Sequence, residues 1–574
     1  MKLDSNHPRP TLQRPGWKSL EGPWNFSLNE ADDPKKVRFD RTIRVPFPPE
    51  SPGSGVGEPW VQVAWYRKVL RIRPRPGLRL FLRFGAVDYR AEVFLNGARV
   101  LEHEGGHTPF GLELTSFLGR PLEVLVRAED DPSDPEKPRG KQALGEPEGI
   151  FYPRTTGIWQ PVWLEWVPES HIASLRLRPD LEALGFHLEV QAVGEGDAVE
   201  VALFPGVRGE VLREKPWLEA RFPLVGGLAR GFLGLPLKGE AGAILWRPEN
   251  PVLFPLRLRL LGGRRVLDEA YSYGGLREVS ARQGVFFLNR EPYFPKLALD
   301  QGLWPEGHLA PPGLEALRQD ILLAKALGFN GVRKHQKLED PRYLHLADRL
   351  GLLVFAEMPS FFRFSPRAAR RYLAELVAAL ERDHNHPSVV AWVLFNESWG
   401  LWPWGPEARS FLQGVFFLAR SLDPTRLLVD NDGFEHGSFW DLYTVHDYAP
   451  PEVLARRYHQ KPFPLAPMGR PLSWEALPEG VRPFLSEFGG VRLKGSTPGW
   501  GYREVEGEEA FLQEVLRYLE VACESLLSGF CYTQLYDTFQ EENGLLDFWR
   551  RPKVPPERVR AFLEGCEARR VLWE

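Results

Sequence analysis

Two glutamates in the second half of the chain have the local context expected of catalytic carboxylates. Glu397 ends the apolar run SVVAWVLFNE (388–397), and Glu487 ends the shorter run PFLSE (483–487). A carboxylate directly after a buried strand is costly unless it is paired or used in chemistry. Two such groups in one pocket could cleave an acetal, because one protonates the leaving oxygen while the other attacks the anomeric carbon or activates water. The alternative is that either glutamate is a salt-bridge partner of a nearby arginine.

The pattern after residue 276 predicts strands that alternate with amphipathic helices. Strands are expected at 293–300, 330–335, 352–359, 388–397, 426–430, 441–447, 483–487 and 529–534, and helices near 313–327 and 341–350. A third helix is expected to begin with Ser365 as N-cap and Pro366 at its first position. About eight such units in roughly 300 residues match a (β/α)8 barrel, whose functional groups lie at the C-terminal ends of the strands. Glu397 and Glu487 end the fourth and seventh predicted strands.

Two β-rich units are expected before the barrel. Period-two alternation over 64–74, 79–85, 91–97 and 161–168 predicts a β-sandwich, and Asn96-Gly97 is a strong hairpin turn. The next hundred residues contain strand-like segments spaced for a small immunoglobulin-like sandwich, with no residues suggestive of chemistry. We therefore expect three domains, at residues 1–170, 171–275 and 276–574.

The composition favours a globular protein and argues against nucleic acid as a partner. The 574 residues are 43% hydrophobic and 26% charged, and 72 Lys plus Arg against 76 Asp plus Glu give a net charge of −4 without a basic block. Aromatic residues reach 12%, with 19 Trp, which mildly favours a carbohydrate ligand because sugar C–H faces stack on rings. Large β-sandwiches are also rich in aromatic residues. Three Met, three Cys and 53 Pro indicate a thermophilic source.

The cysteines and the N-terminus indicate where the protein functions. Cys523, Cys531 and Cys566 are odd in number and lack metal-ligand spacing, which argues against a disulfide framework and against a zinc site. The first residues lack the apolar region of a signal peptide, and no run of 18 apolar residues predicts a membrane span. We therefore expect a cytoplasmic protein without a membrane partner, and a homo-oligomer is compatible with the sequence.

The most specific motifs of the predicted barrel are RDHNHPSVVAWVLFNESWG (382–400), FLSEFGG (484–490) and GFCYTQLYDTFQEENGLLDF (529–548). These three segments resemble glycoside hydrolase family 2, which includes β-galactosidases, β-glucuronidases and β-mannosidases. The first two domains contain further matches, such as FGAVDYRAEVFLNG (84–97) and LWRPENPVLFPL (245–256). The resemblance implies an N-terminal jelly-roll β-sandwich that is sugar-binding-like, an immunoglobulin-like sandwich and a catalytic (β/α)8 TIM barrel.

The resemblance also implies roles for individual residues in a retaining mechanism. Glu487 would be the nucleophile, Glu397 the general acid/base, and Asn396 the group that binds the sugar 2-hydroxyl. Tyr448, in VHDYAP, resembles a family tyrosine that hydrogen-bonds the nucleophile, with core packing as the alternative. The other substrate-binding candidates are Arg333, His386, Trp399, Tyr532 and Asp88. For the histidine a helix-end cap, and for Trp399 and Tyr532 a place in the core, are the alternative interpretations.

One stretch departs from the family pattern and bears on the choice of sugar. Family members have Arg-x-Ser-His-Tyr-Pro after the second strand, whereas this chain has VRKHQKLEDP (332–341). Arg333 matches, but the histidine is displaced by one position, so no substrate role is transferred to His335. Lys334 and Lys337 add positive charge that could tolerate an acidic sugar.

These residues together predict a retaining exo-β-glycosidase that acts on terminal non-reducing sugars, with β-galactosidase-like specificity preferred. The alternatives are a β-glucuronidase, β-mannosidase, galacturonidase or arabinosidase, or a carbohydrate-binding protein without catalysis. The carbohydrate is the expected partner. No cofactor is predicted, although some relatives use Mg²⁺ or Na⁺ and the residue spacing leaves that open.

Overall fold

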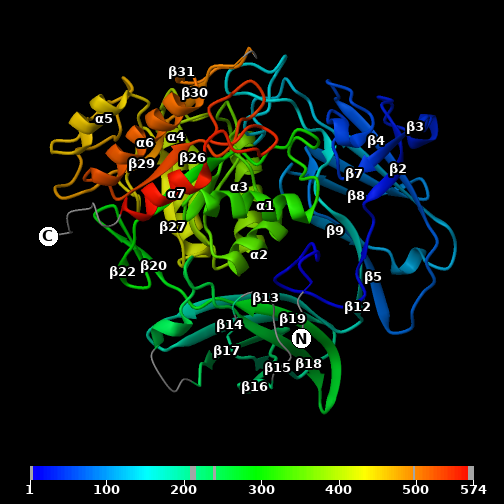
Figure 1. Cartoon of the computed structure of the whole chain (residues 1–574). Helices are drawn as coiled ribbons and strands as arrows, with labels where there is room; N and C mark the ends of the chain where they lie inside the picture. The colour runs from blue at the N-terminus through cyan, green and yellow to red at the C-terminus, as the bar shows by residue number, and fades with distance from the viewer. Residues whose placement is uncertain (1–3, 207, 209–214, 237–240, 496–497, 567–574) are drawn as a thin grey trace.

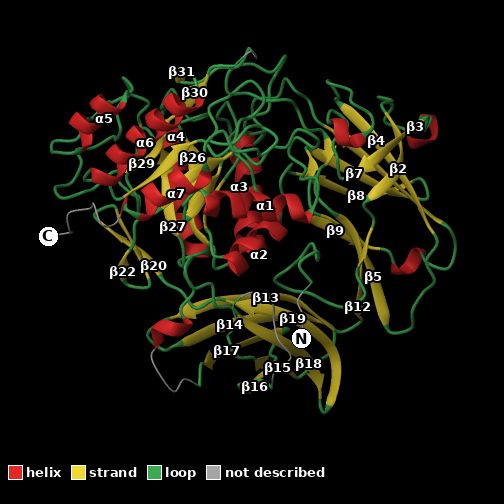
Figure 2. Ribbon diagram, in the orientation of Figure 1, coloured by secondary structure: helices red, strands yellow, loops and turns green. Residues whose placement is uncertain are grey.

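The computed structural model describes residues 4–206, 208, 215–236, 241–495 and 498–566. Figure 1 shows two β-rich bodies, one built from the blue first part of the chain and one lying below it, beside a larger body coloured green to red. In Figure 2 the helices gather in that larger body, and strands dominate the other two. The predicted fold class, two sandwiches followed by a barrel, is confirmed.

The first β-rich body is a sandwich of two antiparallel sheets. One sheet has the order β3-β2-β4-β10-β7-β8 and the other β1-β12-β5-β9, with β11 paired to β6. The elements are β1 (Lys18–Ser19), β2 (Gly22–Ser27), η1 (Pro34–Lys36), β3 (Arg41–Val45), η2 (Pro52–Ser54), β4 (Val63–Leu70), β5 (Leu78–Phe84), β6 (Val87–Asp88), β7 (Arg90–Leu95), β8 (Ala98–Glu104), β9 (Phe110–Glu113), η3 (Thr115–Phe117), β10 (Leu122–Glu129), β11 (Gly157–Ile158) and β12 (Val162–Pro168). Asn96 and Gly97 form the predicted hairpin turn between β7 and β8, both with positive φ.

The second β-rich body is a smaller sandwich. Its sheets have the orders β13-β14-β17 and β16-β15-β18-β19. The elements are β13 (His171–Asp180), β14 (Gly185–Val193), β15 (Ala198–Leu203), β16 (Leu218–Pro223), β17 (Leu228–Gly234), η4 (Ala241–Ile244), β18 (Phe254–Gly262) and β19 (Arg265–Gly274). The N-terminal segment packs on this sandwich, since Leu12 belongs to its core and the Gln13 N–H donates to the Tyr271 carbonyl.

The third body is an eight-stranded parallel barrel surrounded by helices. Its strands are β23 (Lys296–Asp300), β24 (Gly331–Lys334), β25 (Leu353–Glu357), β26 (Val389–Asn396), β27 (Leu427–Asp432), β28 (Thr444–His446), β29 (Phe484–Gly489) and β32 (Gly529–Thr533). They are hydrogen-bonded in the order β27-β26-β25-β24-β23-β32-β29-β28, and β27 and β28 lie side by side, so the sheet nearly closes. A two-stranded sheet of β30 (Val491–Leu493) and β31 (Arg503–Val505) follows the seventh strand.

The helices follow the predicted alternation with one exception. They are α1 (Leu314–Ala326), α2 (Pro341–Leu350), α3 (Pro366–Asp383), α4 (Pro406–Leu422), α5 (Pro451–Tyr458), α6 (Glu508–Glu524) and α7 (Pro556–Glu564). Ser365 caps α3 as predicted, since its hydroxyl accepts the N–H of Ala368 at 3.0 Å. No helix joins β27 to β28, because the connection 433–443 is too short to form one and cross back. None of the described helices is long and apolar enough to cross a membrane.

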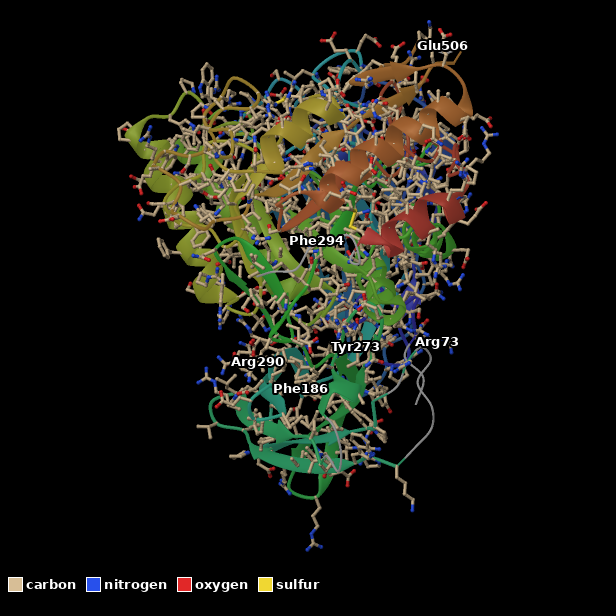
Figure 3. All side chains as sticks on the ribbon, turned by 60° about the vertical axis from the view of Figure 1, so that its left-hand side comes forward. Arg73, Phe186, Tyr273, Arg290, Phe294 and Glu506 are labelled. Carbon is tan, nitrogen blue, oxygen red and sulfur yellow. A yellow bond between two sulfur atoms is a disulfide. The ribbon has the colours of Figure 1, made fainter. Side chains whose placement is uncertain are left out.

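The lower end of the barrel is closed by apolar side chains. The small sheet of β20 (Val279–Arg282), β21 (Val285–Leu288) and β22 (Glu291–Pro292) lies under the strands. Its Phe286 stacks on Phe355, which stacks in turn on Phe484 inside the barrel. Figure 3 shows Phe186 in the second sandwich, Phe294 in the barrel and Tyr273 between them, where its hydroxyl donates to Asp348 of α2. A substrate pocket must therefore open at the other end of the barrel, where the strands terminate.

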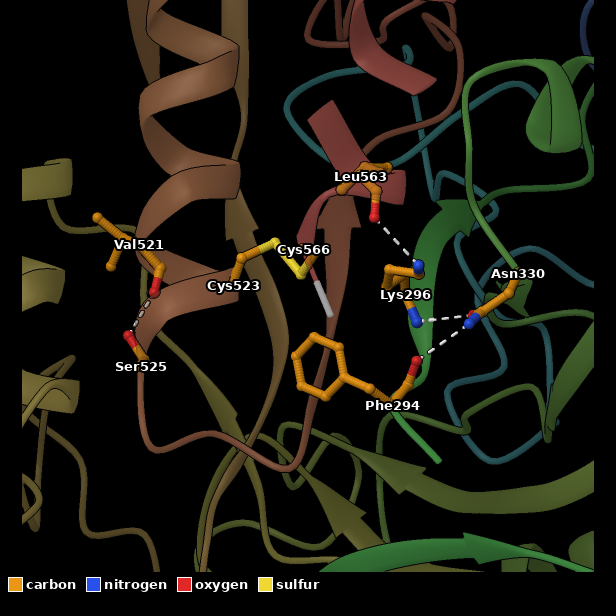
Figure 4. Close-up of a disulfide and its surroundings, with 8 residues drawn as sticks. All are labelled: Phe294, Lys296, Asn330, Val521, Cys523, Ser525, Leu563 and Cys566. Carbon is orange, nitrogen blue, oxygen red and sulfur yellow. Dashed lines mark hydrogen bonds between the residues drawn. A yellow bond between two sulfur atoms is a disulfide. The ribbon is translucent and has the colours of Figure 1, made fainter. Parts of the chain in front are cut away.

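A disulfide joins the last two helical segments, and the prediction against one is wrong. Cys523 in α6 is bonded to Cys566 just after α7, as Figure 4 shows, and Cys531 is free and buried. The packing of α7 beside α6 brings the two Cα atoms to 5.3 Å, a normal disulfide distance, although 43 residues separate them. A crosslink over a loop of this length stabilises the fold by roughly 4 kcal/mol in the chain-entropy model.

Candidate active site

Glu397 and Glu487 meet at the open end of the barrel. A carboxylate oxygen of each lies within 4.8 Å of the other. All eight residues of β26 are buried, and the chain then turns sharply, with positive φ at Glu397 and Ser398. Such backbone is costly for residues other than glycine. It is held here by the Glu397 N–H, which donates to the Asp432 carbonyl at 2.9 Å, and this turn aims the Glu397 carboxylate across the barrel mouth.

A small pocket contains both carboxylates. Its lining consists of Lys141, Ile150, Leu299, His335, Asn396, Glu397, Trp399, Tyr448, Glu487, Tyr502, Thr533 and Glu541. Most of these residues come from barrel strands and the loops after them. Lys141 and Ile150 come instead from the long loop between β10 and β11 of the first sandwich. The first domain therefore completes the wall of the pocket.

Glu487 is fixed by donors on two sides. The Tyr448 hydroxyl donates to one of its oxygens at 2.7 Å, and the Arg333 guanidinium donates to the other at 3.1 Å. Arg333 also donates to the amide oxygen of Asn396 at 2.7 Å, which leaves the amide NH₂ group available to a ligand. The nucleophile candidate is thus oriented, and three of the predicted substrate-binding residues gather around it.

The Arg333 cation supports a cluster of buried carboxylates. It is 1% exposed and forms ion pairs with Glu357 at 2.8 Å, with Asp432 and with Glu487. Burial would lower the pKa of Arg333, but the charges of Asp432 and Glu357 raise it well above its usual value. The guanidinium stays charged and offsets part of the negative charge at the barrel mouth.

Glu397 is paired with a strand-end histidine to which the sequence analysis assigned no role. The Nδ1 atom of His446 lies 2.7 Å from the Glu397 carboxylate. Burial raises the pKa of Glu397, but the hydrogen bond and charge of His446 lower it below its ordinary value. Burial lowers the pKa of His446, but the carboxylates of Glu487 and Asp432 raise it to about 10. The resting pair is therefore an imidazolium beside a carboxylate.

Glu397, His446 and Glu487 also bring three potential metal-binding atoms within 4.8 Å of one another. Both ring nitrogens of His446 already face carboxylate oxygens, at 2.7 Å from Glu397 and 3.2 Å from Asp432. A protonated ring in these contacts is a hydrogen-bond donor and has no lone pair for an ion. We interpret the cluster as a hydrogen-bonded network.

Trp399 lies where a sugar-binding residue was predicted. Its ring lines the pocket and stacks on Phe362 at a centroid distance of 5.6 Å. A second aromatic pair, Tyr448 on Tyr502 at 3.5 Å, lines the pocket as well. Aromatic faces of this kind are suited to the C–H faces of a pyranose.

The prediction that His386 touches substrate is wrong. His386 lies three residues before β26, at the closed end of the barrel, whereas Glu397 follows the other end of that strand. Its ring is fully buried and bonds Asp348 at 2.6 Å and the Tyr273 hydroxyl at 3.2 Å. The residue therefore holds the second sandwich to the barrel.

Tyr532 was also placed on the wrong face of its strand. Its ring packs edge-on against Phe488 at 5.6 Å, within the core between the barrel and its helices. The next residue, Thr533, lines the pocket and lies 3.1 Å from the Tyr448 hydroxyl. Because side chains alternate along a strand, only one of the two neighbours can face the pocket.

Asp88 does not line the pocket, and its prediction as a substrate contact is wrong. Its carboxyl accepts a hydrogen bond from Gln142 at 2.7 Å and lies against the backbone of Gly106. The next residue, His107, donates its N–H to Glu375 of α3 at 3.1 Å. Asp88 and Glu375 thus form a buried acidic pair where the first sandwich meets the barrel.

This acidic pair predicts a pH-dependent stability. Burial, together with the neighbouring Asp88 charge, raises the pKa of Glu375 to about 8, far above its unfolded value of about 4.3. Between these values the unfolded chain releases a proton that the folded chain keeps, so stability falls as the pH rises from about 4 to 8. Glu375→Gln is therefore expected to stabilise the protein by roughly 1–3 kcal/mol at pH 8 and little at pH 4. Thermal unfolding at both pH values measures this, and equal pH slopes for variant and wild type would contradict it.

Two further pocket residues were not selected from the sequence. His335 follows β24, and its Nδ1 lies 3.0 Å from Glu357. Burial, and then the charges of Lys141 and Arg333, hold the pKa of His335 well below its usual value, so it presents a neutral ring to the pocket. Lys141 forms no ion pair with any residue that the structure describes. The position of His335 at a predicted strand end could indicate a site residue. No local pattern indicates Lys141, because this lysine lies in a loop of another domain.

A parallel barrel with two carboxylates fixed at its strand ends, inside a pocket lined by aromatic rings, has the groups that glycosidic bond cleavage needs. Fold and site together define the class of protein as a barrel-type glycoside hydrolase.

Comparisons with known proteins identify the family. The profile described as "Glycosyl hydrolases family 2, TIM barrel domain" matches residues 312–466. The chain is 26% identical over 451 residues to a β-glucuronidase of Streptococcus agalactiae, covering 71% of this chain and 70% of the relative. It is also 26% identical over 412 residues to a β-galactosidase of Thermoanaerobacter pseudethanolicus, covering 67% of this chain and 51%, about half, of that relative. The barrel of this chain therefore belongs to the TIM barrel domain of glycoside hydrolase family 2.

Solved structures share the whole fold. A β-D-glucuronidase of Dictyoglomus thermophilum aligns with a TM-score of 0.75 at 20% identity, covering 96% of this chain and 97% of that one. A β-galacturonidase of Eisenbergiella tayi bound to galacturonate aligns with a TM-score of 0.74 at 20% identity, covering 97% and 98%. At this level of identity the likeness shows the common architecture of three domains.

Proposed function

We propose that the protein is a retaining exo-β-glycosidase that removes a terminal non-reducing sugar with Glu487 as nucleophile and Glu397 as acid/base. The observation that carries the proposal is the separation of the two carboxylates, whose oxygens lie within 4.8 Å. Retaining enzymes place these groups about 5–5.5 Å apart, whereas inverting enzymes need about 6.5–9.5 Å to admit a water molecule. The small pocket, closed below by the barrel core, suits the end of a glycan rather than its middle.

The mechanism has two displacements. In the first, a Glu487 oxygen forms a bond to the anomeric carbon as the bond to the leaving oxygen breaks, and Glu397 delivers a proton to that oxygen. In the second, Glu397 takes a proton from water, whose oxygen displaces the Glu487 carboxylate and restores the β configuration. Asn396 offers its NH₂ group to the sugar hydroxyl next to the anomeric carbon, a contact that strengthens as positive charge develops there.

The decisive test is hydrolysis of a panel of p-nitrophenyl β-glycosides followed by proton NMR of the first-formed anomer. The β anomer is expected from whichever sugar is cleaved. An initial α anomer would contradict the covalent mechanism, and no turnover on any sugar would favour the carbohydrate-binding alternative.

The identity of the sugar has two candidates. A β-galactoside is the preference of the sequence analysis. A β-uronide is favoured by Lys141, a cation in the pocket wall without an ion-pair partner among the described residues. A sugar carboxylate would supply that partner. The relatives named above include enzymes for both classes of sugar.

Lys141→Met separates these candidates. For a uronide substrate the variant is expected to lose roughly 10- to 100-fold in kcat/KM, since a charge-assisted hydrogen bond is worth about 1.5–3 kcal/mol. Neutral glycosides should change by less than about threefold. Lys494→Met, which removes an exposed lysine paired with Glu506, is the matched control. Equal kcat/KM for wild type and Lys141→Met on the best uronide would assign Lys141 no part in specificity.

A further inference from the structure

His446 lies between the two carboxylates that the proposed mechanism uses. Its ring is fully buried at the end of β28. Nδ1 faces Glu397 at 2.7 Å, while Nε2 lies 3.2 Å from Asp432 and 3.5 Å from Glu487. Gly433 forms the wall behind the ring, because a Cβ there would come within 2.5 Å of it. The ring is therefore fixed with one nitrogen on the acid/base and the other toward the nucleophile.

The charged and titratable groups around the ring come from every neighbouring strand end. They are Glu397 after β26, Asp432 at the end of β27, Glu487 in β29, and Arg333 of β24 at 3.5 Å, with His335 and Lys141 beyond them. Three carboxylates and one guanidinium face the ring directly, so negative charge exceeds positive charge around it. This surplus of negative charge keeps the imidazole protonated, and burial of Glu487 and Asp432 strengthens the effect.

The protonated ring of His446 bears on where Glu397 obtains the proton that it gives to the leaving group. The first displacement needs a proton on Glu397, yet the charge of His446 favours the ionised form of that carboxyl. The proton of the pair lies on Nδ1, one hydrogen bond away from the Glu397 oxygen. A residue that only held Glu397 in place would not need to carry this proton.

We propose that His446 is a positioning residue that stores the catalytic proton and exchanges it with Glu397 in each half-reaction. The proposal rests on the proposed function. As the Glu487 oxygen bonds to the anomeric carbon, Nδ1–H passes its proton to Glu397, and Glu397 passes a proton to the leaving oxygen. The glycosyl-enzyme then contains an ester at residue 487, an ionised Glu397 and a neutral His446.

The second half-reaction returns the proton. Water gives a proton to Glu397 and its oxygen bonds to the anomeric carbon, while the bond to Glu487 breaks and that carboxylate takes back its electron pair. Glu397 passes the proton to Nδ1, which restores the imidazolium and the resting enzyme. The loss and return of the Glu487 charge therefore drive the proton off the ring and back onto it.

His446→Asn tests the proposal through the pH profile. In the wild type the proton is held by an imidazolium among carboxylates, so activity should extend to alkaline pH. In the variant it must reside on Glu397 itself, a weaker base, and the basic limb of kcat/KM is expected to move down by at least one pH unit. The matched control is His386→Asn, which removes a buried, carboxylate-bonded histidine at the closed end of the barrel and should leave the basic limb in place.

Nitrogen NMR of the wild-type protein labelled in histidine gives a test that does not depend on a folded variant. The His446 resonances are expected to be those of an imidazolium at pH 8 in the free enzyme and of a neutral ring after trapping of the glycosyl-enzyme with a 2-deoxy-2-fluoro glycoside. A ring that stays in one state in both forms, or an unshifted basic limb in His446→Asn, would overturn the proposal. Absence of any glycoside hydrolysis by the wild type would instead refute the proposed function.

Discussion

Replacing Glu487 with glutamine is expected to lower kcat by at least about 10³-fold on every glycoside that the wild type cleaves. An amide oxygen is a much poorer nucleophile than a carboxylate oxygen, so the covalent glycosyl-enzyme is not expected to form in the variant. Glutamine keeps the shape of the side chain, and its single carbonyl oxygen can still accept one of the two hydrogen bonds that Tyr448 and Arg333 donate to the carboxylate. The loss should therefore fall on the chemical step, with KM little changed.

The matched control for this variant is Glu541→Gln. Glu541 lines the same pocket, and its carboxyl accepts hydrogen bonds from Tyr152 and Asn543. Its replacement should lower kcat by less than about tenfold, because it is not placed against Glu397. Intact-protein mass spectrometry after reaction with a 2-deoxy-2-fluoro glycoside should detect a covalent adduct in the wild type and in Glu541→Gln. An adduct in Glu487→Gln, or full activity of that variant, would assign the nucleophile to another residue.

The barrel and its carboxylates could be predicted because their signals are local. The run 389–396 is apolar at nearly every position, and the structure buries all of it between neighbouring strands and helices. Ser365 and Pro366 specify a helix start through one hydrogen bond and one fixed φ. A charged residue after such a run then stands out, since nothing in the strand itself can pair with it.

The remaining site residues depend on contacts between segments far apart in the chain. Lys141 reaches the pocket only because the first sandwich packs beside the barrel, and its loop has no pattern that would indicate this. Tyr532 and Thr533 are neighbours in a strand and face opposite sides of it. Both faces of this short strand are buried, so its sequence pattern does not reveal which of the two residues faces the pocket. His386 was predicted to contact substrate because it lies within the motif 382–400, yet the length of β26 separates it from Glu397.

His446 and the disulfide illustrate the same limit in different ways. His446 ends a three-residue strand that the pattern marked, but its value as a partner of Glu397 depends on β26 and β28 bringing their ends together. Cys523 and Cys566 pair because α7 packs beside α6, so counting cysteines could not find the bond. Each case needs the tertiary arrangement before the chemistry can be assigned.

Replacing Glu397 with alanine is expected to separate substrates by their leaving groups. For a poor leaving group, such as an unactivated alcohol, kcat/KM should fall about 10²–10⁴-fold, the usual contribution of a general acid. For 2,4-dinitrophenolate, which departs without a proton, kcat/KM should change by less than about tenfold. The turnover number kcat on that substrate should still fall, because the glycosyl-enzyme of the variant lacks the base that activates water.

The expected loss of the base in Glu397→Ala can be measured with azide. It is an anion that needs no base, so it should restore kcat of Glu397→Ala on the dinitrophenyl substrate and yield a β-glycosyl azide, identified by its anomeric proton signal. The wild type should show little response to azide. Equal losses in kcat/KM on both leaving groups, without rescue, would mean that Glu397 supports the fold of the barrel mouth, and the turn that aims it across from Glu487 would then have no part in proton transfer.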